Sequence, residues 1–145
     1  MPTLEDLLRR PRALEAVKED AATLIRTLVR EQRGLRGRTM RSGLMALESA
    51  HPGFLEASIL RMLPLVAETL QAHYDQGAAG GDVPGYFASN EEKIADDLLR
   101  VTDGLAESTQ RAWVARAYGM LRPQARAYVR DGLPQLANLL VKHLG

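Results

Sequence analysis

Apolar residues recur at intervals of three and four along most of this chain, which is the spacing of one face of an α-helix. The clearest stripe follows Pro11, a residue suited to the first turn of a helix. Its members are Leu14, Val17, Ala21, Leu24, Ile25 and Leu28. Before this stripe, Thr3 and Asp6 have the spacing of a capping box. The pattern therefore predicts a short helix and then a long amphipathic one.

Glycine and proline mark the ends of the elements that follow. Gly34 and Gly37 are expected to end the long helix, and Thr39 is placed to cap the next one. The sequence His51-Pro52-Gly53 predicts a turn, after which helical spacing continues through Pro64. Because proline has no backbone N–H to donate, Pro64 must either kink that helix or restart it.

A glycine-rich segment divides the chain. Residues 76–86 hold four glycines and a proline, so we expect a flexible surface loop there. A capping box begins the next helix at Ser89, and Gly104 is expected to end it. Pro123 and Pro134 are then placed to open two further helices.

Two segments of the sequence are similar to each other. Residues 57–67 and 127–137 share a skeleton with a Leu-Pro step, which a duplication would explain. Chance is the alternative, because Leu and Ala together supply 43 residues. We predict one all-α domain of seven or eight helices over residues 1–145, packed as two similar halves about a pseudo-twofold axis. The first half covers about 1–75, the loop 76–86 and the second half about 87–145.

Composition agrees with a helical fold that has a single core. Val and Ile supply only 11 residues, and strands depend on such residues. The stripes place Leu24, Leu63, Leu98 and Leu99 in the core. We therefore expect Leu98→Ala to cost about 2 to 5 kcal/mol of stability.

Several of the segments that shape the backbone resemble the sequence pattern of a known protein family. They are Gly34-Leu35, Pro52-Gly53, Met62-Leu63-Pro64, Gly85-Tyr86-Phe87, Ala95-Asp96-Asp97-Leu98-Leu99, Val101-Thr102-Asp103, Ala117-Tyr118-Gly119-Met120-Leu121-Arg122 and Leu133-Pro134. Together they resemble an uncharacterised family of small all-helical bacterial proteins, a domain of unknown function. The chain departs from that pattern at Arg41 and Leu44, where the family usually has Lys and Tyr. The resemblance implies a helical fold and carries over no activity.

The cellular compartment is suggested by residues that are missing. The chain has no Cys, which is compatible with a reducing compartment and removes thiolate chemistry. Its first residues lack the basic and apolar regions of a signal peptide, and no run of 18 apolar residues occurs. We expect a cytoplasmic protein without a membrane span.

Charge is distributed in blocks although the net charge is only +1. Residues 26–41 hold six Arg and one Glu, residues 68–107 hold nine acids, and residues 111–130 hold five Arg and no acid. These blocks either pair with one another in the fold or form patches for a partner, and pairing is the more common outcome. The candidate anion-binding residues are Arg33, Arg36, Arg38, Arg41, Arg122, Arg126 and Arg130.

Catalytic and metal-binding patterns are incomplete. Glu48 and His51 have the Glu-x-x-His spacing of carboxylate-bridged metal sites, but the sequence has no second copy of it. Glu92 and Asp96 share a helix face, where a solvated or paired role is more common than acid–base chemistry. No hydrolase motif is present. We expect no enzyme, no cofactor and no metal.

These observations favour the role of an interaction module. We predict a non-enzymatic helical module that self-associates or binds another protein. The alternative is an anion or nucleic-acid binding protein that uses the Arg-rich segments 26–41 and 111–130. Nucleic acid is not favoured, because the pI of about 8.1 is low for a dedicated nucleic-acid binder.

Overall fold

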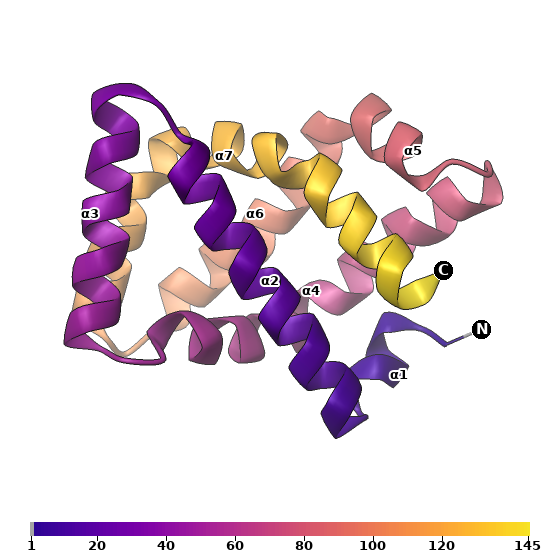
Figure 1. Ribbon diagram of the computed structural model, residues 1–145, viewed down its shortest axis with the longest axis horizontal. Coiled ribbons are helices and arrows are strands. Elements are labelled where there is room, and N and C mark those ends of the chain that lie inside the picture. Colours follow the sequence, from indigo (N-terminus) through magenta and orange to yellow (C-terminus); the bar gives the residue numbers. More distant parts are fainter. Residues whose placement is uncertain (1) are drawn as a thin grey trace.

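Stripes rich in Leu and Ala fold into helices throughout this chain. The computed structural model describes residues 2–145, except for the side chain of Arg36. Within that part of the chain there are seven helices and no strand (Figure 1). The helices are α1 (Leu4–Leu8), α2 (Pro11–Glu31), α3 (Gly34–Ala50), α4 (Phe54–Ala79), α5 (Val83–Ser89), α6 (Glu91–Ser108) and α7 (Ala112–Leu144). The predicted all-α fold is confirmed.

The boundaries near the N-terminus agree with the sequence pattern. In the capping box of α1, the Thr3 hydroxyl accepts from the Asp6 N–H and the Asp6 carboxylate accepts from the Thr3 N–H. Pro11 is the first residue of α2. The turn before α4 contains Gly53 at φ 79°, a left-handed backbone conformation that glycine adopts without strain.

The predicted loop at residues 76–86 is wrong. α4 extends to Ala79 and α5 begins at Val83, so only three residues connect the two helices. Glycine allows close packing here, because a Cβ on Gly77 would lie 2.9 Å from the Cα of Val83. Gly81 makes the connecting turn at φ 79°. Glycine in this segment therefore serves a tight corner and not a flexible linker.

The prediction that Pro123 and Pro134 open separate helices is also wrong. Both lie inside α7, and Pro64 lies inside α4 without ending it. All three prolines are exposed. Their rings therefore lie away from the face of each helix that packs against the rest of the protein.

Other predicted boundaries are displaced by strong helix formers on either side. Thr39 lies inside α3, where its hydroxyl donates to a backbone carbonyl, and Gly37 and Gly104 also lie inside helices. Ser89 ends α5 instead of capping α6, whose N-cap residue is Asn90. Cap and turn propensities are weak preferences that helical neighbours override.

The main hydrophobic core lies at the end of the molecule that holds both chain termini (Figure 1). Its buried residues are Leu4, Leu7, Val66, Ala67, Leu70, Val83, Phe87, Ile94, Leu133, Ala137, Leu140 and Leu144. A smaller core between α2 and α4 consists of Val17, Ala22, Leu55, Ile59 and Leu63. We call the region built from α1, α5, residues 66–79 of α4 and residues 132–144 of α7 the packed end.

The predicted core leucines differ in their burial. Leu63 and Leu99 are buried, as predicted. Leu24 and Leu98 are only partly buried, because they line a cavity between helices. For these two the prediction is wrong, and we now expect the cost of Leu98→Ala to lie at or below the lower end of the earlier range.

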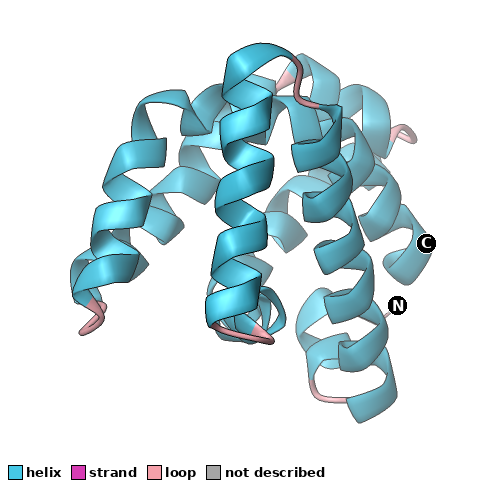
Figure 2. Ribbon diagram, turned by 60° about the vertical axis from the view of Figure 1, so that its left-hand side comes forward, coloured by secondary structure: helices cyan, strands magenta, loops and turns pink. Residues whose placement is uncertain are grey.

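α3 and the first half of α7 lie away from both termini (Figure 1). Short loops join the helices throughout, as Figure 2 shows. In the described part of the chain, every helix is too short or too polar to cross a bilayer. The internal duplication stays a prediction.

Candidate functional site

α3 and residues 112–131 of α7 form the least buried part of the molecule, which we call the open end. Among the described residues, Gly37 is the only buried one from 30 to 53, and none is buried from 100 to 131. Large apolar side chains are exposed there: Leu35 by 79%, Met45 by 69%, Met120 by 79% and Leu121 by 46%. Four of the seven large apolar side chains that are exposed in the described part of the chain thus belong to these two segments, and exposed apolar surface of this kind is typical of a site that contacts a partner.

An aromatic contact joins the two parts of the open end. The His51 ring, at the end of α3, stacks on Trp113 with 4.4 Å between ring centroids and 6° between ring planes. Phe54 also contacts Trp113, with centroids 5.2 Å apart. Stacked rings of this kind add about 0.5 to 1.5 kcal/mol to the burial of the rings. The start of α7 is therefore held against the turn between α3 and α4.

The second arginine block pairs with the acidic helix α6. The ion pairs are Arg122–Asp103, Arg126–Glu92, Arg126–Asp96 and Arg130–Glu92. Hydrogen bonds from Arg122 and then from the Tyr118 hydroxyl hold the pKa of Asp103 below its ordinary value. The charges of three candidate anion-binding residues are thus neutralised within the fold.

Part of the first arginine block also has partners inside the molecule. The Arg26 guanidinium lies 2.7 Å from the Glu48 carboxylate and 2.6 Å from the Glu56 carboxylate, which ties α2 to α3 and α4. The Arg41 guanidinium donates to the backbone carbonyl of Gln32 at 2.7 Å, next to the end of α2. Both arginines therefore stabilise the position of α3.

The remaining arginines of the open end are exposed. Arg33, Arg38, Arg111 and Arg116 have no ion pair with another described residue. The side chain of Arg36, a further candidate anion-binding residue, lies outside the described part of the chain. The open end and the residues that flank it thus carry exposed positive charge.

A buried polar cluster joins α4, α5 and α6. His73 is 5% exposed, and its ring nitrogens lie 3.2 Å from the Tyr86 hydroxyl and 2.9 Å from the Asp97 carboxylate. Burial raises the pKa of Asp97, but hydrogen bonds from His73 and Lys93 outweigh it and leave the pKa below its ordinary value. Sequence spacing gave no sign of this cluster, because His73 and Asp97 lie on different helices.

The Glu-x-x-His pattern has other partners in the fold. Glu48 pairs with Arg26, and His51 stacks on Trp113. Within the described residues, no three His, Asp or Glu side chains come together in a way that could hold a metal ion.

A cavity of about 360 Å³ lies between α2, α4, α6 and α7, with Met40 of α3 at its edge. Its lining is almost wholly apolar, and Gln32, Thr102 and Tyr128 are the only polar residues in it. The Tyr128 hydroxyl is buried without a hydrogen-bond partner among the described residues. The apolar periodicity of the sequence identified the lining residues as core residues, but it does not indicate that the helices leave space between them.

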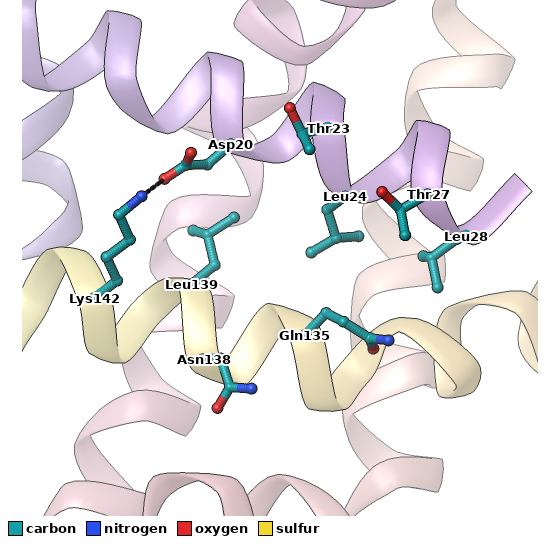
Figure 3. Close-up of a pocket in the computed structure, with 9 residues that line it drawn as sticks. All are labelled: Asp20, Thr23, Leu24, Thr27, Leu28, Gln135, Asn138, Leu139 and Lys142. Carbon is teal, nitrogen blue, oxygen red and sulfur yellow. Dashed lines mark hydrogen bonds and ion pairs between the residues drawn. The ribbon is translucent and has the colours of Figure 1, made fainter. Parts of the chain in front are cut away.

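A groove lies between α2 and the second half of α7 (Figure 3). Asp20 and Lys142 form an ion pair of 2.8 Å at one end of it. Leu24, Leu28 and Leu139 line both this groove and the cavity. These three leucines therefore lie where the groove and the cavity approach each other.

Comparison with known proteins identifies a family but no activity. A family model described as "Family of unknown function (DUF6918)" matches residues 4–144. Searches of curated proteins and of solved structures gave no match. Since the family model covers nearly the whole chain, the protein belongs to this family, and the predicted resemblance to an uncharacterised helical family is confirmed.

Proposed function

We propose that this member of a family of unknown function is a non-enzymatic helical interaction module that self-associates through its open end. One observation carries the proposal. α3 and residues 112–131 of α7 bury none of their described side chains, although several of these side chains are large and apolar. Leu35, Met45 and Met120 are each at least 69% exposed. A second copy of the chain would cover them.

The gain from covering these side chains is large enough to matter. Burying one Leu or Met side chain contributes about 1.5 to 3 kcal/mol. Association of two molecules costs about 4 to 15 kcal/mol in lost freedom, so several side chains must be covered together. In a twofold-symmetric dimer the same patch occurs on both copies, and each exposed side chain counts twice.

Charge sets the salt dependence of this association. Arg33, Arg38, Arg111 and Arg116 lie at the open end, so two copies that meet there bring like charges together. Salt screens this repulsion over about 10 Å at 0.1 M. Self-association is therefore expected to strengthen as salt rises.

Analytical ultracentrifugation over a range of concentrations and salt tests the proposal. The unmodified chain is expected to shift from monomer to dimer as its concentration rises. The double variant Met45→Glu with Met120→Glu is expected to stay monomeric. Val141→Glu is the matched control, because Val141 is also apolar and 40% exposed but lies at the packed end. A chain that stays monomeric at millimolar concentration, or a double variant that dimerises as tightly as the control, contradicts the proposal.

An anion or nucleic-acid binding protein is the second candidate, and the exposed Arg33 and Arg38 favour it. Its salt dependence has the opposite sign, because counterion release weakens binding to DNA as salt rises. A duplex DNA of mixed sequence is the probe. This candidate predicts binding at low salt that Arg33→Ser with Arg38→Ser weakens, whereas a chain that binds no DNA at low salt contradicts it.

A further inference from the structure

We infer that the cavity between α2, α4, α6 and α7 is a binding site for an uncharged, mainly apolar molecule of about a dozen carbon atoms. This site is distinct from the surface proposed for self-association. Among the described residues that line it, only Met40, Tyr128 and Val129 belong to the open end.

The helices that surround the cavity leave it unfilled. Met62, Leu98 and Leu136 have the size and polarity of core residues, yet each is only partly buried and faces this space. Protein interiors are otherwise packed about as densely as organic crystals. Side chains that line a void lose dispersion contacts, and an apolar occupant restores them. The cavity is therefore suited to a molecule that supplies those contacts.

The lining excludes charged ligands and disfavours water. None of the described residues that line the cavity is charged. A buried water needs two to four polar partners, and the Thr102 hydroxyl is already bonded to the Leu99 carbonyl and the Tyr118 hydroxyl. The Tyr128 hydroxyl, which has no partner among the described residues, can satisfy one polar group of a ligand after a small shift. The favoured ligand has at most one such group.

The volume sets the size of the ligand. An engineered apolar cavity of about 150 Å³ in another protein holds one benzene ring. A volume of about 360 Å³ therefore fits a molecule roughly twice as large. Both a two-ring aromatic compound and a chain of about ten carbons satisfy this limit, and they share the apolar chemistry that the lining requires.

The route between solvent and the cavity is short where α2 and α7 meet. Leu24, Leu28 and Leu139 lie between the cavity and the groove of Figure 3, and all three are partly exposed. The rim of the groove holds neutral polar side chains, among them Thr27 and Gln135 (Figure 3). The cavity is itself partly open to solvent, so a ligand can enter without unfolding. Rotamer changes of the three leucines, which are fast for exposed side chains, widen the path.

Fluorescence titration of the full-length chain with 1-naphthol tests the inference. This uncharged probe is expected to bind one molecule per chain and to saturate. Naphthalene and 1-decanol are the two competitors, and displacement by one more than the other tells a ring-shaped ligand from a chain-shaped one. Absence of saturable binding by all three compounds overturns the inference.

Variants on α2 test whether the probe binds in the cavity. Ala21→Phe fills the cavity from its wall and is expected to weaken probe binding at least tenfold. Ala16→Phe is the matched control, because Ala16 is exposed on the same helix and does not line the cavity, and its affinity is expected to be unchanged. If circular dichroism shows that Ala21→Phe does not fold, Leu136→Phe fills the same cavity from the part of α7 that lies outside the open end. Equal affinity of the folded filling variant and the control overturns the inference.

The test of the cavity site can fail or succeed independently of the test of self-association. Probe binding that survives cavity filling but is lost in the variant Met45→Glu with Met120→Glu would place the probe on the open end and overturn the cavity site. Conversely, Ala21→Phe is expected to leave the monomer–dimer equilibrium unchanged, because Ala21 is not in the open end.

Discussion

The two halves of α7 share one helix and one apolar periodicity but differ in what covers them. Residues 132–144 lie at the packed end and bury Leu133, Ala137, Leu140 and Leu144. Residues 112–131 bury none of their side chains, although Met120 and Leu121 are as apolar as the residues of the second half. This difference shows that an apolar stripe predicts a helix, whereas the burial of the stripe depends on which other elements pack against it.

The first half of α7 is held mainly by polar groups. Its arginines pair with the carboxylates of α6, and Trp113 stacks against the turn after α3. Exposed ion pairs contribute little, about 0 to 1 kcal/mol each. The open end is therefore expected to be the less stable part of the molecule, and a partner surface there gains more than it would at the packed end.

The largest expected effect contrasts two residues of α7 directly. Leu140→Ala removes a side chain that is 1% exposed and is expected to lower the free energy of unfolding by about 2 to 5 kcal/mol. Met120→Ala removes one that is 79% exposed and is expected to change it by no more than about 0.5 kcal/mol. Urea denaturation of dilute protein, where the chain is monomeric, measures both. Equal losses of stability would mean that Met120 is covered within the monomer.

The next effect concerns acid stability and the polar cluster at the packed end. The folded-state pKa of Asp97 is below its ordinary value, so the stability it contributes is present above about pH 4 and is lost as the pH falls through the folded pKa. Asp97→Asn is expected to cost about 1 to 3 kcal/mol at pH 7, because a hydrogen bond to a charged group is lost. Thermal melts between pH 7 and pH 3 give the readout.

The acid sensitivity of this variant tests the contribution of Asp97 directly. Asp97→Asn is expected to lose less stability than the unmodified chain between pH 5 and pH 3, since the group that titrates is gone. Glu91→Gln, at an exposed carboxylate without a resolved ion pair among the described residues, serves as the control. A variant whose melting temperature falls with pH as steeply as that of the control would exclude Asp97 as a source of the acid sensitivity.

The smallest effect concerns the cavity. Tyr128→Phe removes a buried hydroxyl that has no partner among the described residues and is expected to raise the free energy of unfolding by about 1 kcal/mol. Tyr74→Phe, whose parent side chain is only partly buried at the packed end, is the control and is expected to have little effect. A loss of stability in Tyr128→Phe would show that the hydroxyl has a partner in solution.

Local sequence patterns predicted the helices well and their ends poorly. The capping box at Thr3 and the position of Pro11 follow from chemistry within one helical turn. Gly77 and Pro123 misled the prediction because both residues are tolerated inside helices when neighbouring elements or solvent accommodate them. Whether a glycine breaks a helix or allows close packing depends on a contact with Val83 that the helical spacing does not contain.

Predicting the candidate sites required tertiary structure even more than predicting the helix ends did. The sequence left two outcomes open for the charge blocks, pairing within the fold or a patch for a partner, and favoured pairing. The ion pair between Arg122 and Asp103 shows pairing for the second arginine block. The hydrogen bond between His73 and Asp97 joins residues 24 apart on different helices, which periodicity cannot align. The cavity is the least predictable, since it is defined by atoms that are missing between correctly identified apolar stripes.

Hydrogen–deuterium exchange, measured by peptide in dilute and in concentrated protein, tests most directly whether the open end is covered by a second copy. In dilute protein, amides of α3 and of residues 112–131 are expected to exchange faster than those of residues 132–144. At high concentration the protection of α3 and of residues 112–131 is expected to rise, while that of residues 132–144 stays the same. Protection of α3 that is high in dilute protein, or that does not change with concentration, would contradict self-association through the open end.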